Sequence, residues 1–90
     1  MPEAKLKIIN PLGLHARAAA QLVRLAAKYE SRILLVRRDS AVSADAKSIL
    51  SVLTLAAARG TEIDLSVNGA DEQAAIKAVV ELFASGFGEL

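Results

Sequence analysis

Polar and apolar side chains alternate without a break in TEIDLSV, residues 61–67. This period of two is typical of a strand with one buried face and one solvated face. Gly60 before the stretch and Asn68-Gly69 after it are residue types that end helices and strands. A strand with one wet face favours an antiparallel sheet that helices cover on its other face.

The segments on either side continue an alternation of strands and helices. In the segment before this strand, Ile49, Val52, Leu53 and Ala56 recur at the i, i+3, i+4, i+7 spacing of a helix face. We expect strands at 5–9, 31–37, 41–43 and 61–67, and helices at 16–29, 47–58 and 71–83. The order predicts an α+β fold in which helices cover one face of a largely antiparallel sheet.

Composition excludes several classes of protein. Ninety residues suit one small domain, 1–90, and 53% apolar residues are too many for a disordered chain. A formal net charge of +1 leaves no basic surface for nucleic acid. Without cysteine and with a single histidine, the chain has no disulfide and no multi-histidine metal site of its own. The apolar runs are too short to span a membrane and the N-terminus is unlike a signal peptide, so we expect a cytosolic protein.

The single histidine lies in Gly13-Leu14-His15-Ala16-Arg17, where a loop meets the start of the first helix. A first helical turn binds anions through its backbone N–H groups, and a guanidinium suits phosphate. Because a neutral imidazole is a nucleophile, one hypothesis is that His15 accepts a phosphoryl group, which Arg17 and the helix end then steady. The alternative is a polar helix cap at His15 and a solvated Arg17.

Two motifs lie far apart in the chain: NPLGLHARAAA at 10–20, and AKSILSVLTL at 46–55 followed by ARGTEI at 58–63. The first resembles the active-site signature of the HPr family, the histidine phosphocarriers of the bacterial phosphoenolpyruvate-dependent phosphotransferase system. The second is similar to the segment around the regulatory serine of that family. The resemblance covers essentially the whole chain. It implies an HPr-like open-faced β-sandwich, with a four-stranded antiparallel sheet and three helices on one face.

The resemblance also implies roles for individual residues. His15 matches the histidine that phospho-Enzyme I phosphorylates at Nδ1 and that an EIIA-type acceptor discharges, and Arg17 matches the arginine that supports the phosphoryl group. An apolar patch that docks partners is expected at Leu14, Ile49, Leu50 and Leu53. By pattern, Leu50 lies off the buried stripe of its helix and is the best candidate for an exposed contact.

Ser48 matches the serine that a dedicated HPr serine kinase phosphorylates in some lineages. Its position at the start of a helix also suits an unmodified N-cap, and the sequence favours neither reading. A phosphate there would add roughly −1.5 to −2 charge beside the apolar patch and weaken docking.

One residue departs from the pattern of the family. Ala18 follows the arginine where the family commonly has proline. We expect the helix start to survive, because alanine is also favourable in a helix, with less rigid positioning of His15. The alanine-rich run and the tail at 83–87 are more similar to the nitrogen-related branch of the family.

We therefore expect a monomeric phosphocarrier that is no enzyme in the turnover sense and needs no cofactor. It would serve sugar uptake or a regulatory phosphorelay. The alternative is a regulatory binding module on the same fold, controlled by phosphorylation of Ser48.

Overall fold

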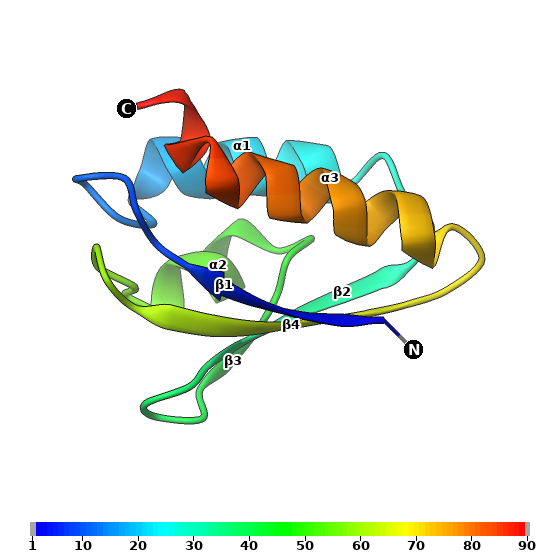
Figure 1. Ribbon diagram of the computed structural model, residues 1–90, viewed down its shortest axis with the longest axis horizontal. Coiled ribbons are helices and arrows are strands. Elements are labelled where there is room, and N and C mark those ends of the chain that lie inside the picture. The colour runs from blue at the N-terminus through cyan, green and yellow to red at the C-terminus, as the bar shows by residue number, and fades with distance from the viewer. Residues whose placement is uncertain (1, 90) are drawn as a thin grey trace.

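The computed structural model describes residues 2–89. Its elements follow in the order β1 (Glu3–Lys7), α1 (Ala16–Ala26), β2 (Arg32–Arg37), β3 (Ser43–Asp45), α2 (Ile49–Thr54), β4 (Glu62–Asn68), α3 (Glu72–Ala84) and the 3₁₀ turn η1 (Gly86–Gly88). The four strands form one sheet in the order β1-β4-β2-β3, and every neighbouring pair is antiparallel. The helices lie on one side of this sheet, with α1 and α3 next to each other above it (Figure 1). The expected α+β architecture is therefore confirmed.

The central strand β4 is the stretch with strict alternation. Its apolar residues Ile63, Leu65 and Val67 are fully buried under the helices. Leu65 lies between Leu35 of β2 and Ala4 of β1 in the register of the sheet. The core that these residues share with α1, α2 and α3 is made almost wholly of Leu, Ile, Val, Ala and Phe.

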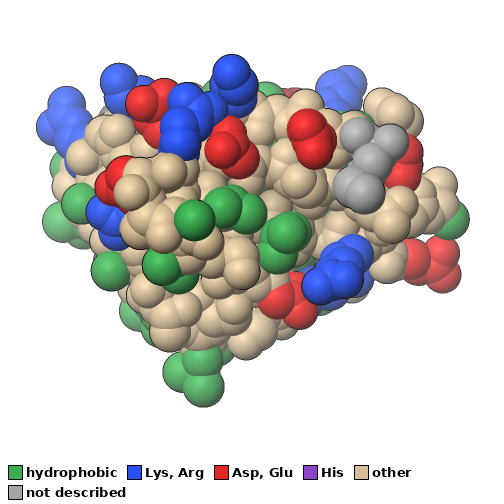
Figure 2. Space-filling view, turned by 90° about the horizontal axis from the view of Figure 1, so that it is seen from below, with side chains coloured by type: hydrophobic (Ala, Val, Ile, Leu, Met, Phe, Trp, Pro, Cys, Tyr) green, Lys and Arg blue, Asp and Glu red, His purple; other side chains and the backbone are tan. Residues whose placement is uncertain are grey.

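No helix among residues 2–89 covers the opposite face of the sheet (Figure 1). Figure 2 shows this side with basic, acidic and apolar side chains interspersed over it. The Arg38 guanidinium pairs there with Glu62 at 3.2 Å and with Asp64 at 2.7 Å. These carboxylates therefore serve surface ion pairs, which agrees with their position on the polar face of the strand.

The second helix is shorter than the sequence predicts. Instead of spanning 47–58, α2 ends at Thr54, and Ala56 takes a left-handed backbone with φ of 48°. The Arg37 guanidinium donates to the carbonyls of Leu55 and Ala56 at 2.8 and 3.1 Å, so it closes the helix end. On this helix Val52 is fully buried, whereas Ile49 of the same predicted stripe is 40% exposed, which agrees with its place in the expected docking patch.

Two other boundaries differ from the predicted ones. The weak strand predicted at 41–43 is displaced to Ser43–Asp45, because Ala41 adopts φ of 59° in the turn between β2 and β3. The first helix ends at Ala26 rather than 29, where the N–H groups of Lys28 and Tyr29 bond three residues back in a tighter turn. The longest helix, α3, has 13 residues, and none within residues 2–89 is long and apolar enough to cross a membrane.

Asp71 ties two loops together at the start of α3. Its carboxylate accepts hydrogen bonds from the backbone N–H groups of Glu30 and Ser31, each at 2.9 Å, and from the Ser31 hydroxyl. These bonds, above all the one from the hydroxyl, lower the pKa of Asp71. Because the carboxylate is stabilised in the folded state, this contribution is present above the unfolded pKa and is lost as the pH falls through the folded one.

We expect Asp71→Asn to lower the urea midpoint of unfolding at pH 7 and to flatten its dependence on pH. Asn offers one acceptor oxygen where three donors converge on the carboxylate. Urea midpoints at pH 7 and at about pH 3 test this, because the unfolded pKa of Asp is about 3.9. An equal loss of stability between the two pH values in wild type and variant would contradict it.

Candidate functional site

The loop between β1 and α1 is built on close backbone contacts. Gly13 has φ of 67°, and its N–H donates to the carbonyl of Asn10 at 3.1 Å. The next N–H, of Leu14, donates to the carbonyl of Ala57 at 2.9 Å and so fastens the loop to the segment after α2. A Cβ on Gly13 would lie 2.5 Å from that same carbonyl oxygen, so only glycine fits here. The loop therefore delivers the next residue, His15, to a fixed place.

His15 is the N-cap of α1. Its backbone is extended, with φ of −75° and ψ of 178°, and its Nδ1 accepts a hydrogen bond from the N–H of Arg17 at 3.3 Å. His15 therefore caps the helix, and the same geometry brings Nδ1 to a helix end where backbone N–H groups lack partners within the helix. Ala18 is buried within α1, so the helix start survives without proline as expected.

A carboxylate from the far end of the chain holds the other ring nitrogen. Nε2 of His15 lies 2.5 Å from Oε2 of Glu89, a residue 74 positions away in the sequence. The second oxygen, Oε1, accepts from the side-chain amide of Asn10 at 3.0 Å. These bonds, first that of Asn10 and then that of His15, lower the pKa of Glu89. Because Glu89 is ionised at neutral pH, Nε2 is the nitrogen that carries a proton and Nδ1 is the one with a free lone pair.

The C-terminal segment is anchored so that Glu89 reaches this place. Phe87 is buried with a left-handed backbone at φ of 57°, and its ring packs edge to face on Phe83 with the centroids 5.0 Å apart. Figure 1 shows the end of the chain beside the start of α1 and the loop after β1. Neither Glu89 nor Asn10 is marked as a site residue by the local sequence pattern. An aromatic residue, Phe87, between two glycines is the sequence feature that could have indicated a docked C-terminal segment.

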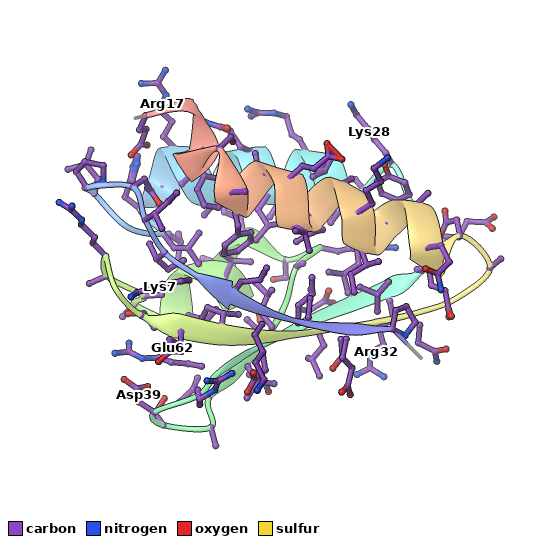
Figure 3. The ribbon with its side chains drawn as sticks, viewed as in Figure 1. Lys7, Arg17, Lys28, Arg32, Asp39 and Glu62 are labelled. Atoms are coloured by element: carbon purple, nitrogen blue, oxygen red, sulfur yellow. The ribbon has the colours of Figure 1, made fainter. Side chains whose placement is uncertain are left out.

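Arg17 is exposed on the first turn of α1 and has no hydrogen-bond partner for its guanidinium among residues 2–89. Figure 3 shows its side chain projecting from the end of the molecule where the C-terminal segment lies. Its positive charge also contributes to the lowered pKa of Glu89. The guanidinium is thus available to an incoming anion near the imidazole.

The residues of the expected apolar patch differ in exposure. Leu50 is 74% exposed and Ile49 is 40% exposed on α2, which packs against α1, and Leu53 is half-buried. Leu14 is buried in the core at 5% exposure, which corrects the expectation that its side chain faces a partner. Leu12 is 69% exposed in the loop before His15 and was missed by the sequence analysis.

Ser48 is the N-cap of α2. Its hydroxyl oxygen accepts from the N–H of Ser51 at 3.3 Å, and its side chain is half-buried. The capping role expected from the sequence is therefore confirmed.

The site contains one nucleophile, one free cation and one carboxylate, and within residues 2–89 no group of side chains could hold a metal ion. The imidazole is 27% exposed, so a reagent can approach it from outside. A neutral imidazole with a free Nδ1 lone pair can attack an electrophilic phosphorus, and Arg17 can neutralise the oxygens that arrive.

Residues 2–85 match the family described as PTS-HPr, PTS HPr component phosphorylation site. A phosphocarrier protein HPr from Cupriavidus necator is 48% identical over 82 residues, or 91% of this chain and 90% of that protein. A phosphocarrier protein NPr from Klebsiella oxytoca is 40% identical over 93% of this chain and 92% of that protein.

Solved structures agree with the sequence relatives. The crystal structure of HPr-C-His from Thermoanaerobacter tengcongensis has a TM-score of 0.94 at 41% identity and covers 100% of this chain and 99% of its own. A crystal structure of an HPr dimer from the same organism has a TM-score of 0.77 at 42% identity, over 99% of this chain and 100% of its own.

Proposed function

This chain belongs to the HPr family of phosphotransferase-system phosphocarriers, and from that premise we propose that it carries a phosphoryl group on Nδ1 of His15. Phospho-Enzyme I would be the donor and an EIIA-type protein the acceptor, in sugar uptake or in a regulatory phosphorelay. The carrier would act in the cytoplasm as a monomer, the simplest state for a shuttle. It would be used and regenerated once per transfer.

The arrangement of the two ring nitrogens of His15 carries this proposal. Nε2 is engaged by Glu89, whereas Nδ1 faces the first turn of α1 and the N–H of Arg17 at 3.3 Å. A phosphoryl group on Nδ1 would replace the weak cap contact. Its oxygens would accept hydrogen bonds from the unpaired N–H groups of that turn and from the Arg17 guanidinium. The charge that the group brings is therefore met by donors already in place.

The transfer balances as two displacements at phosphorus. In the first, the lone pair of Nδ1 forms a bond to phosphorus while the bond from phosphorus to phospho-Enzyme I breaks, and the electron pair leaves with the donor. In the second, a nucleophile of the EIIA-type protein attacks the same phosphorus and Nδ1 recovers its lone pair. Within residues 2–89 no group of side chains could hold a metal ion, and in this proposal the partners supply the remaining catalytic groups of both steps.

Intact-mass spectrometry tests the function directly. The protein is incubated with Enzyme I and phosphoenolpyruvate, and its mass is recorded under neutral to alkaline conditions. We expect the mass of one phosphoryl group (HPO3) to be added and to be lost on mild acid treatment. An unchanged mass beside an active Enzyme I from the same organism would contradict the proposal.

Ser48 gives the basis for a second function, regulation of docking. Its side chain caps the helix that presents Leu50, the most exposed large apolar residue among residues 2–89. A phosphate on Ser48 would stand beside this apolar surface and oppose a partner by its charge and its hydration. Regulation by a serine kinase would then weaken exchange with Enzyme I while the fold is retained.

We expect Ser48→Asp to weaken binding to Enzyme I about tenfold, because one carboxylate carries part of the charge of a phosphate. Isothermal titration calorimetry with Enzyme I measures it. Ser40→Asp, in the loop between β2 and β3, is the control for added charge alone. Wild-type affinity in Ser48→Asp, or an equal loss in Ser40→Asp, would remove the support for regulation.

A further inference from the structure

We propose that Glu89 is a positioning residue for phosphoryl transfer, which acts through Nε2 of His15 to orient the imidazole and to balance its charge when Nδ1 takes the phosphoryl group. The inference rests on the proposed function and assigns a role to the C-terminal segment of the chain.

The carboxylate of Glu89 is fixed in place by hydrogen bonds and partly shielded from solvent. Its two oxygens meet two different donors, Nε2 of His15 at 2.5 Å and Nδ2 of Asn10 at 3.0 Å. The Glu89 side chain is only 13% exposed, against 62% for Asp39 in its surface ion pair with Arg37. A carboxylate shielded in this way interacts more strongly with its partner than one in open solvent.

Asn10 orients Glu89 from the other side. Asn10 is fully buried, and its amide nitrogen donates both to Glu89 and to the carbonyl of Gly13 at 2.8 Å. Its Oδ1 accepts no hydrogen bond within residues 2–89. Leaving a buried acceptor unpaired costs free energy, so the amide is oriented by its donor bonds. One side chain thus links the carboxylate to the glycine turn that precedes His15.

The tail is fastened before it reaches the site. Phe87 is 3% exposed, packs on Phe83 of α3 and holds a left-handed backbone, while Gly86 and Gly88 on either side also have positive φ. These residues turn the chain after α3 back toward the start of α1. Glu89 is therefore delivered by a packed segment rather than by a free end.

The chemistry gives the carboxylate a task in the transfer step. When the Nδ1 lone pair bonds to phosphorus, the ring keeps its proton on Nε2 and becomes a cation. The negative charge of Glu89 stabilises that cation through a hydrogen bond that already exists, so the side chains need not rearrange during the step. The same bond fixes the ring so that Nδ1 and not Nε2 faces the donor.

Glu89→Gln tests the proposal while keeping the shape of the side chain. Gln has one acceptor oxygen, so it can serve His15 or Asn10 but not both. We expect kcat for phosphorylation by phospho-Enzyme I to fall about tenfold, the effect of a charge-assisted hydrogen bond, with KM unchanged within about twofold. Glu81→Gln makes the same charge change at an exposed position on α3 and should behave as wild type.

A spectroscopic measurement separates positioning from a merely structural role. Because the chain has one histidine, ¹⁵N labelling of histidine reports on His15 alone. We expect a strongly hydrogen-bonded Nε2–H proton signal in the wild type and a weaker or lost one in Glu89→Gln, because a neutral amide accepts less strongly than a carboxylate, while both proteins keep the same circular dichroism spectrum.

The outcomes distinguish the two proposals. Wild-type kcat in Glu89→Gln, a faster transfer, an equal fall in Glu81→Gln, or no Nε2–H signal in the wild type would each overturn the role of Glu89 and leave the phosphocarrier function standing. A wild type that accepts no phosphate from phospho-Enzyme I would overturn the phosphocarrier function, and this inference with it.

Discussion

Replacement of His15 by Ala is expected to abolish phosphorylation by Enzyme I and phosphoenolpyruvate, with no mass added in the assay described above. Nδ1 is the proposed site of attachment, and the chain has no second histidine to take its place. The fold should survive, because loss of a helix cap costs about 1 kcal/mol and domains of this kind are stable by roughly 5–15 kcal/mol. Intact mass and a thermal unfolding curve measure both expectations on one sample.

The matched control is His15→Asn. Asparagine is among the best N-cap residues, so it restores the cap that alanine removes but supplies no nucleophilic nitrogen. A His15→Asn variant that is more stable than His15→Ala and takes up no phosphoryl group would separate the capping role of His15 from its proposed role as acceptor. Phosphate incorporated into either variant would mean that another residue is the acceptor.

The sequence carries the information for the sheet because alternation is a local property. The expected order of elements and the antiparallel, one-sided sheet are confirmed, and the strict alternation of 61–67 corresponds to the central strand, Glu62–Asn68. Where the predictions are wrong, a tertiary contact overrides the local pattern. The helical period continues through residues 55–58 in the sequence. In the structure Arg37 donates to the carbonyls of Leu55 and Ala56, and the N–H of Leu14 donates to the carbonyl of Ala57, so these carbonyls do not continue the helix.

The candidate site likewise has a part that the local sequence predicts and a part that depends on tertiary contacts. His15 and Arg17 lie in one short motif with a helix start, so their proximity follows from the sequence. Glu89 reaches His15 only because α3 crosses back over the sheet and Phe87 packs against it, and no local pattern reports a contact across 74 positions. Leu14 is a residue of the local motif whose exposure the sequence does not predict. Its apolar side chain suits a docking patch as well as a core. In the fold it is buried, in a loop that its N–H fastens to the carbonyl of Ala57.

Gly13→Ala is expected to destabilise the protein by about 2–4 kcal/mol, through backbone strain and a steric clash together. The backbone strain alone costs about 1 kcal/mol, and Ala41 and Ala56 show that alanine does adopt positive φ in this chain. The clash is the larger effect. The new Cβ would lie 2.5 Å from the carbonyl oxygen of Ala57 and 3.0 Å from Cα of Ala58, and both are backbone atoms that cannot rotate away. Thermal unfolding should show a midpoint lower by about 10–20 °C.

Gly60→Ala isolates the strain, because Gly60 also has positive φ, at 92°, but a Cβ there meets nothing within 4 Å. A much smaller fall in its midpoint would assign the difference to the contact between the loop and residues 57–58. That contact includes the bond from the Leu14 N–H to the Ala57 carbonyl, so forcing it apart moves the residue before His15. Gly13→Ala should therefore slow phosphorylation even at temperatures where it is fully folded, whereas Gly60→Ala should not. Equal midpoints in the two variants would mean that the loop yields to the added methyl group, and that Gly13 serves the backbone turn alone.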